Sequence, residues 1–379
     1  MRRTVYGPEH EAFRAAVRTF FEKEVVAHFD EWEERGMPPR DFYDKCGDLG
    51  ILGLGIPEEY GGGGASYLFN AVVAEEAGRL GLGLGPLRIH CDISVPYFVD
   101  HANDEQKARW LPGLASGELV CALALTEPGA GSDLAGLSAS ARLDGDEYVV
   151  NGSKTFITGG LNADVFLTAV KTDPTQRHAG LSLLVIDADA PGVSRGAPMK
   201  KIGLHIQEAC EIFFDDVRVP VANLLGEVGQ GFTYLTSHLP QERMSISVNA
   251  QASAASVVGQ TVDYVNGRKA FGKTIGHFQN TKFVLAGCAT EVEAGWAMLD
   301  RALTALDAGE LTPTDAAKVK LFVTEMQGRV TDACLQLFGG YGYMTEYPVA
   351  RAWADARVGR IYGGSSEIMK TIIAKDLGL

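Results

Sequence analysis

The feature that most constrains the fold of this chain is a change of residue pattern, from helical to strand-like and back to helical. Residues 9–29 carry apolar side chains at helical spacing, and helical stretches continue to about Gly117. Between about Cys121 and Gly226 the apolar residues form short β-prone runs bounded by Gly and Pro. From Gly231 onward the helical spacing returns. The sequence therefore predicts a β domain of roughly a hundred residues between two helical parts, and 379 residues suffice for a large buried core.

The expected β domain contains three recognisable strand segments. Residues 181–188 (LSLLVIDA) and 210–220 (CEIFFDDVRVP) are typical of strands. Residues 146–158 (DEYVVNGSKTFIT) consist of two β-prone runs that meet at Asn151-Gly152. Because Asn-Gly fits the two central positions of a type I′ turn, this segment predicts a hairpin.

The last third of the chain predicts a helical bundle. Two stretches repeat apolar residues every three or four positions, which is the spacing of a buried helical face. The first stripe comprises Val284, Cys288, Val292, Trp296, Leu299, Leu303 and Leu306, and the second comprises Val319, Val323, Met326, Val330, Cys334 and Leu337. Long amphipathic helices joined by short connections pack as a bundle.

Charge and cysteine usage argue against several classes of function. The formal net charge is −14, so neither nucleic acid nor an anionic membrane surface is an expected partner. The six cysteines form no CxxC pair and no cluster at metal-ligand spacing, which predicts reduced, buried thiols and no metal site. The N-terminal segment lacks the apolar core of a leader, and no run of 18 apolar residues occurs. We therefore expect a cytoplasmic protein.

The segment 122–136 (ALALTEPGAGSDLAG) is the first motif that could carry chemistry. Its glycines, with Thr126, Ser132 and Asp133, can present N–H and hydroxyl donors to a polar ring or a thioester. On composition alone, a tight surface turn after a strand is the better explanation. The glycines of 81–86 (GLGLGP) predict only a loop between helices, because the chain has neither GxGxxG after a strand nor GxxxxGK[ST].

The whole string 122–136 closely resembles the signature of the acyl-CoA dehydrogenase family. Further segments share this resemblance in the same chain order: 151–158 (NGSKTFIT), 268–273 (RKAFGK), 336–348 (QLFGGYGYMTEYP) and 355–368 (DARVGRIYGGSSEI). Together they span the chain nearly end to end. Their wording is closest to the long-chain and isovaleryl types of the family.

The resemblance implies an α+β architecture of three parts. These are an N-terminal α-helical domain (1–120), a middle antiparallel, barrel-like β domain (121–226) and a C-terminal four-helix bundle domain (227–379). It also implies an FAD cofactor, an acyl-CoA substrate and a homotetramer built as a dimer of dimers. The implied activity is α,β-dehydrogenation of an acyl-CoA thioester, as in fatty acid β-oxidation, with an electron-transfer flavoprotein as the electron acceptor.

The cofactor contacts that the resemblance implies fall into three groups. Around the flavin ring would lie Leu123, Leu125, Thr126, Phe156 and Thr158, the last near flavin N5. Across a subunit boundary, the diphosphate and adenosine would meet Arg268, Phe271, Gln279, Gln336 and Gly340, and the site would be completed by Ser365 and Glu367. A guanidinium such as that of Arg268 suits a phosphate, although a solvated basic patch explains an isolated arginine better. Glu367 stands where some relatives have Gln.

At Gly363 the chain departs from the pattern of many family members, which have the catalytic Glu directly after this tyrosine. The reaction needs a carboxylate that removes the proton α to the thioester carbonyl. Gly363 can offer only its backbone N–H, as a donor to the developing oxyanion. Glu242 in LPQER (239–243) stands where the long-chain and isovaleryl types carry their base. The missing side chain at Gly363 leaves space for this carboxylate, so Glu242 is the predicted base.

Two other interpretations of these carboxylates stay open. An acid shortly after Pro240 is also explained as a first-turn residue that the helix dipole favours, which would make Glu242 structural. Glu367, four residues after Gly363, is the rival base. The residues expected beside the substrate are Ser132, Arg243, Tyr362 and Gly364.

Three functions are compatible with the sequence. The first is the FAD-dependent acyl-CoA dehydrogenase described above. The second keeps the fold but changes the chemistry, as a flavin oxidase or a dehydrogenase of carrier-protein thioesters. The third is a non-catalytic flavin-binding subunit of a hetero-oligomer. The intact flavin motifs and the presence of Glu242 argue against the third, since a silent subunit is free to lose both.

Overall fold

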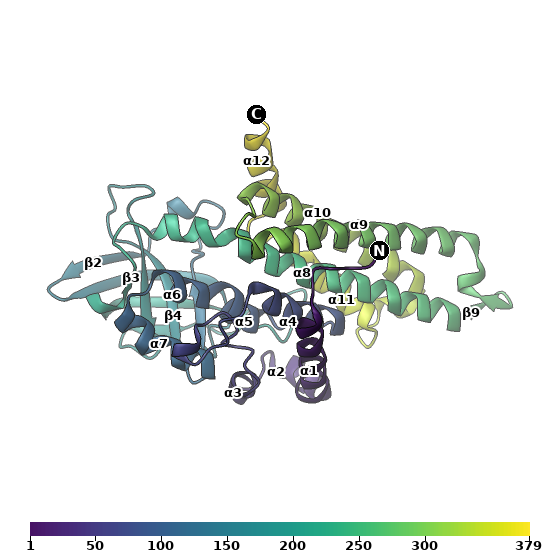
Figure 1. Cartoon of the computed structure of the whole chain (residues 1–379), viewed down its shortest axis with the longest axis horizontal. Coiled ribbons are helices and arrows are strands. Elements are labelled where there is room, and N and C mark those ends of the chain that lie inside the picture. The colour runs from purple at the N-terminus through teal and green to yellow at the C-terminus, as the bar shows by residue number, and fades with distance from the viewer.

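The computed structural model describes residues 1–379, and its elements follow the predicted order of helices, strands and helices. The sheet lies at one end of the long axis, and three long C-terminal helices extend to the other end (Figure 1). The N-terminal helices pack against both parts. None of the helices combines the length and the apolar composition that a membrane span requires.

The N-terminal region is entirely helical, and its helices have clear start and stop signals. Ser66 caps one helix by accepting a hydrogen bond from Leu68 N, and Asn103 and Gln106 form a capping box on another. Gly81 and Gly117 end the same two helices in the left-handed conformation, which favours glycine. The helices are α1 (Pro8–Glu24), α2 (Phe29–Arg35), α3 (Asp41–Asp48), α4 (Tyr67–Leu80), α5 (Gly85–Arg88), α6 (Val95–His101) and α7 (Asp104–Ser116).

The middle region is a mixed sheet with the order β6-β7-β3-β2-β4-β5-β8, and β1 pairs with β4. Most pairs are antiparallel, as expected, but β1 and β2 each run parallel to β4. The expected antiparallel sheet therefore contains two parallel pairings. The strands are β1 (Cys121–Ala124), β2 (Ser140–Asp144), β3 (Glu147–Thr158), β4 (Val165–Lys171), β5 (Leu181–Asp187), β6 (Val193–Arg195), β7 (Ala209–Pro220) and β8 (Leu224–Leu225).

The hairpin predicted at Asn151-Gly152 is wrong, because β3 runs straight through this dipeptide. The register against β7 shifts between Val150 and Gly152, so the glycine belongs to a bulge. Asn151 closes the bulge by exchanging two hydrogen bonds with Asp216. The tight turn lies earlier, at Gly145 between β2 and β3, where Gly145 has a φ of +68°.

The central strands β4 and β5 are buried on both faces. Alternate residues of β4, such as Val165 and Leu167, pack with α6 and α7, whereas Phe166 and Val170 face the interior of the β domain. Each such aliphatic side chain contributes about 1.5–3 kcal/mol when it is buried. The sheet and the N-terminal helices therefore share one core.

The C-terminal region is built on three long helices that pack on each other, α8 (Gly231–Gly267), α9 (Gln279–Asp307) and α10 (Pro313–Phe338). The two predicted apolar stripes supply much of their core, although Leu337 is only partly buried and Phe338 is buried beside it. The shorter helices α11 (Pro348–Ala356) and α12 (Ser366–Asp376) pack on α10. A small hairpin of β9 (Lys269–Ala270) and β10 (Lys273–Thr274) forms the distal tip (Figure 1). All six cysteines are free and buried, as predicted.

Candidate active site

The structure brings Glu242 and Gly363 together. Glu242 lies in the middle of α8, and Gly363 lies in the turn that precedes α12. A Cβ placed on Gly363 would lie 3.5 Å from Glu242 Oε1 and would overlap the Cδ1 of Ile246. A side chain at 363 would therefore contact the carboxylate of Glu242, and it would fit only if Ile246 moved.

The surroundings of Glu242 suit a proton acceptor. Its carboxylate makes no hydrogen bond or ion pair within the chain, so its oxygens are free to meet a substrate. Burial raises the pKa of Glu242, and the positive charges of Arg243 and Lys320 oppose this shift. Because α8 begins at Gly231, Glu242 is not a first-turn residue, and the helix-dipole explanation of this acid is wrong.

The turn that carries Gly363 offers unpaired backbone donors. Gly363 and Gly364 have φ values of +61° and +92°, a left-handed conformation that favours glycine at both positions. Their N–H groups make no hydrogen bond within the chain. Tyr362, directly before the turn, is partly buried, as are both glycines. The turn thus has two unpaired N–H groups, which can hold an oxyanion, and Gly363 within it lies beside Glu242.

The residues predicted around the flavin ring gather at the ends of β1 and β3. The two segments are joined by a hydrogen bond of 2.8 Å from Thr155 N to Thr126 O. Thr158 Oγ accepts a hydrogen bond of 3.5 Å from the side-chain amide of Gln207, so its own O–H remains available to an acceptor. Leu123 and Leu125 are partly buried on the same segment as Thr126. Sequence reasoning missed Gln207, because no motif links it to Thr158.

A buried ion pair that sequence reasoning also missed supports this motif. Lys154 has no exposed surface and donates to Glu127 Oε1 at 2.7 Å and to Leu125 O at 3.1 Å. Glu127 also accepts hydrogen bonds from the backbone N–H groups of Ser138 and Ala139. The pair fixes the loop after β1. The exposed Ser132 lies on this loop, on the side open to solvent.

Two exposed phenylalanines have strained backbones. Phe156 has a φ of +60° and is 67% exposed, and Phe271 has a φ of +53° and is 94% exposed. A left-handed conformation is costly for an aromatic residue, and such strain is concentrated at functional sites. Both residues were predicted to contact the cofactor.

The residues predicted for the diphosphate and adenosine lie at the distal tip of the helical bundle. A recess of about 680 Å³ is lined by Arg268, Phe271, Gln336 and Gly340, together with aromatic residues such as Tyr341. The guanidinium of Arg268 lies 5.1 Å from the ring centroid of Tyr341 and makes no ion pair. Gln279 is the exposed first residue of α9, next to the recess. Figure 1 shows β9 and the sheet at opposite ends of the long axis of the molecule.

Ser365 and Glu367 lie at the start of α12. Ser365 is the N-cap and accepts a hydrogen bond from Ile368 N. Glu367 is exposed, and hydrogen bonds from its own N–H and from Ser365 lower its pKa. This carboxylate is therefore a solvated first-turn residue, in contrast to Glu242.

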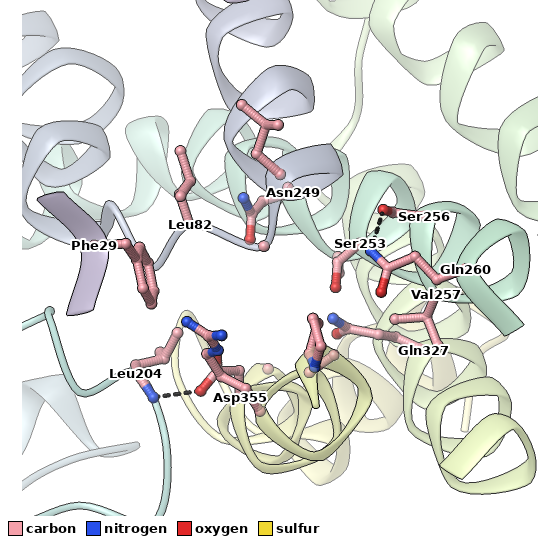
Figure 2. Close-up of a pocket in the computed structure, with 18 of the residues that line it drawn as sticks. Phe29, Leu82, Leu204, Asn249, Ser253, Ser256, Val257, Gln260, Gln327 and Asp355 are labelled. Atoms are coloured by element: carbon pink, nitrogen blue, oxygen red, sulfur yellow. Dashed lines mark hydrogen bonds between the residues drawn. The ribbon is translucent and has the colours of Figure 1, made fainter. Parts of the chain in front are cut away.

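A second cavity lies near the site but does not include Glu242. Its volume is about 280 Å³, and it is lined by α2, α8 and α11 and by residues such as Leu82, Leu204 and Tyr362. Figure 2 shows the polar side chains of Asn249, Ser253 and Gln327 around it. A hydrocarbon chain prefers an apolar lining, so this cavity is not a good acyl compartment.

Comparison with known proteins identifies the family. Three family models match consecutive parts of the chain: the N-terminal domain of acyl-CoA dehydrogenase at residues 7–118, its middle domain at 122–217 and its C-terminal domain at 229–378. The chain belongs to the acyl-CoA dehydrogenase family, and the expected fold of this family is confirmed.

Individual relatives are similar over nearly the whole length of this chain. The long-chain specific mitochondrial acyl-CoA dehydrogenase of Sus scrofa is 40% identical over 377 residues, which are 99% of this chain and 88% of that protein. The crystal structure of an acyl-CoA dehydrogenase from Geobacillus kaustophilus is 46% identical, with full coverage of both chains and a TM-score of 0.98. An acyl-CoA dehydrogenase from Bacillus anthracis in complex with FAD is 31% identical, covers 98% of this chain and 67% of its own, and has a TM-score of 0.92.

Proposed function

We propose that this protein catalyses the FAD-dependent α,β-dehydrogenation of an acyl-CoA thioester to the trans-2-enoyl-CoA, with Glu242 as the base. The observation that carries this proposal is the approach of Glu242 to Gly363. Many family members have a Glu at the latter position, and a Cβ there would lie 3.5 Å from the Glu242 carboxylate. A base projected from α8 can therefore act on the same substrate carbon.

The residues around Glu242 support proton removal at carbon. Its carboxylate takes the proton from the α carbon, while the free N–H groups of Gly363 and Gly364 stabilise the enolate-like oxygen of the thioester. Burial raises the pKa of Glu242 and makes it a stronger base than an exposed carboxylate. Arg243, whose Nε lies 3.5 Å from Gly363 O, orients the turn.

The side chains of the β domain fit a flavin. The O–H of Thr158 is free to donate because its oxygen accepts from Gln207, which suits an acceptor atom such as flavin N5. The exposed ring of Phe156 can cover an aromatic face. When bound, FAD supplies the acceptor for the hydride that leaves the β carbon.

The cofactor site requires a second copy of the chain. The flavin residues lie in the β domain, whereas the Arg268 recess lies at the tip of the helical bundle, so we infer that the recess that completes an FAD site comes from a neighbouring subunit. This supports at least a dimer, and a dimer of dimers as the family implies. We further propose a cytoplasmic enzyme of fatty acid β-oxidation that passes its electrons to an electron-transfer flavoprotein.

An anaerobic reduction screen tests the function. Purified yellow protein is mixed with acyl-CoA thioesters of different length and branching, and the visible absorbance of FAD is followed. Bleaching by at least one thioester, with slow reoxidation in air, supports the dehydrogenase. Rapid oxygen consumption with peroxide release would indicate an oxidase instead. Protein that no acyl-CoA bleaches would contradict the proposal.

A further inference from the structure

Lys320 is a buried lysine without a carboxylate partner. It lies on α10, has no exposed surface, and makes no ion pair. Its Nζ donates a hydrogen bond of 2.8 Å to Gly364 O. A lysine is almost never fully buried unless it is paired, because removing its charge from water is costly. This position therefore calls for a functional explanation.

Lys320 and Arg243 hold the same turn from two different helices. Arg243 on α8 approaches Gly363 O with its Nε at 3.5 Å, and Lys320 on α10 binds the next carbonyl along the chain. Arg243 is also buried and also lacks an ion pair. Two unpaired, buried cations thus converge on consecutive carbonyl groups. Both glycines have left-handed φ values, a conformation that favours glycine at these positions.

The position of this turn determines the room around the proposed base. The Cβ position of Gly363 lies 3.5 Å from Glu242 Oε1, so a small shift of the turn changes the space in which the carboxylate meets its substrate. A shift also moves the two free N–H groups away from the substrate oxygen. A catalytic donor misplaced by about 1 Å can cost about a hundredfold in rate.

The charge of Lys320 also acts on Glu242 directly. Four charged groups face the amine: Glu242 and Arg243 on α8, Glu325 on α10 and Glu367 on α12. Burial and the charge of Arg243 lower the pKa of Lys320 to about 8, so the amine is still mostly protonated at pH 7. Its positive charge in turn lowers the pKa of Glu242 against the effect of burial.

We propose that Lys320 is a positioning residue that holds the Gly363–Gly364 turn in place and keeps Glu242 ionised. The inference rests on the proposed role of Glu242 as base and deepens it. Because an ionised carboxylate is the active form, activity falls as the pH falls through the pKa of Glu242. Removing the Lys320 charge raises this pKa and moves the acid limb of the pH profile to higher pH.

The test uses FAD-loaded, full-length protein with Lys320→Met, Lys320→Gln and Lys318→Met. The Met variant removes both the charge and the donor, and the Gln variant removes the charge but keeps an N–H donor. Lys318 lies on the same helix but is partly exposed, with its amine near Asp315 and Asp376, so its variant is the matched control. The readouts are kcat/KM from pH 6 to 8, hydrogen exchange of the 361–364 amides, and Tm.

We expect the ratio of variant to wild-type kcat/KM to fall about tenfold between pH 8 and pH 6 for both Lys320 variants. Faster amide exchange in the turn is expected for Lys320→Met, without a lower Tm, because the substitution removes a buried, unpaired charge. Lys318→Met should match the wild type. An acid limb that stays in place in both Lys320 variants would overturn the proposal, as would unchanged exchange in the turn.

The outcome can be separated from that of the proposed function. Hydrogen exchange requires no turnover, so it tests the hold on the turn even if no acyl-CoA reduces the wild-type FAD. If Lys320→Met does not fold, the pH profile of Lys320→Gln decides the electrostatic part in the same way.

Discussion

The two ends of the proposed catalytic machinery differ in how complete they are within one chain. The region of Glu242 and Gly363 is built from α8, α10 and the turn before α12, and its cations and carboxylate already contact or face each other. The recess of Arg268 at the bundle tip is open, and two of its aromatic side chains, Phe271 and Tyr341, are exposed. The region of Glu242 and Gly363 is complete within one chain. We propose that the Arg268 recess is completed by a ligand and by a neighbouring subunit.

The difference shows what each region can contribute. Proton removal needs groups held to a fraction of an ångström, which the packed interior of a single chain provides. Cofactor binding needs a large polar surface, and here the predicted cofactor residues are divided between the β domain and the tip of the helical bundle (Figure 1). We therefore propose that the chemistry depends on one subunit and that cofactor retention depends on a second subunit as well.

The largest expected effect on cofactor binding comes from removing the cation of the open recess. Arg268→Met should weaken FAD binding by about 10- to 100-fold, because a charge-assisted bond contributes about 1.5–3 kcal/mol. Equilibrium dialysis of FAD measures the change. Arg301→Met, on the exposed part of α9, is the control and should retain wild-type affinity.

Co-expression of the Arg268→Met and Glu242→Gln variants tests whether the recess and the base that act on one FAD come from different chains. In a mixed oligomer, an Arg268→Met chain can use the Arg268 of a Glu242→Gln neighbour and still provide its own base. We expect the mixture to regain part of the activity that neither variant has alone. Equal inactivity of mixed and separate preparations would mean that the recess and the base of one chain serve the same FAD molecule.

Moving the carboxylate from position 242 to position 363 tests whether either position can supply the base. Glu242→Gly with Gly363→Glu moves the carboxylate, but the new Cβ overlaps Ile246 Cδ1 and φ at this position is +61°. We therefore expect little turnover from the double variant. Adding Ile246→Ala should raise turnover about tenfold, the rate equivalent of 1.4 kcal/mol of relieved strain. No gain from the third substitution would show that Ile246 is not the obstacle.

A moderate effect is expected at the flavin residues of the β domain. Thr158→Val removes one hydroxyl donor, and a typical hydrogen bond contributes about 1 kcal/mol, so the rate of FAD reduction should fall about fivefold. Thr290→Val on the exposed face of α9 is the control. Stopped-flow absorbance measures both rates. An unchanged rate in Thr158→Val would remove this hydroxyl from the site.

The smallest effect concerns two helix caps of the same kind. Ser66→Ala and Ser365→Ala each remove an N-cap oxygen, at α4 and α12 respectively, and each should cost about 0.5–2 kcal/mol of unfolding free energy. Only the second cap lies next to the turn with Gly363. Ser365→Ala should therefore also slow turnover, and denaturation curves with matched kinetics distinguish the two variants.

Much of the fold could be predicted from the sequence, because its signals are local. The apolar stripes of α9 and α10 and the change of pattern at Cys121 correspond to elements of the structure. The hairpin predicted at Asn151-Gly152 is absent because of contacts with a distant strand. Pairing with β7 and a hydrogen-bonded Asp216 stabilise a bulge there, and a turn signal read in isolation cannot reveal a partner about sixty residues away.

Only those residues of the candidate site that lie in recognisable motifs could be predicted from the sequence. The resemblance to the family and the absence of a side chain at Gly363 predict that Glu242 lies close to this glycine. The structure has these two residues side by side. Gln207 and Lys320 lie outside the motifs, and Lys154 lies within 151–158 without a role that the motif reveals. Each acts through a contact with a residue distant in sequence. Such supporting side chains become visible only when the chain is folded.

The most direct test of the central claim is the anaerobic half-reaction of Glu242→Gln with an acyl-CoA that bleaches the wild type. Rapid mixing measures the rate of FAD reduction, with Glu367→Gln as the matched control. We expect Glu242→Gln to keep its FAD and to react at least about a hundredfold more slowly, since a positioned base contributes about 10²- to 10⁴-fold. Glu367→Gln should react at nearly the wild-type rate. A Glu242→Gln variant that stays within a few-fold of the wild type would contradict the assignment of the base to α8.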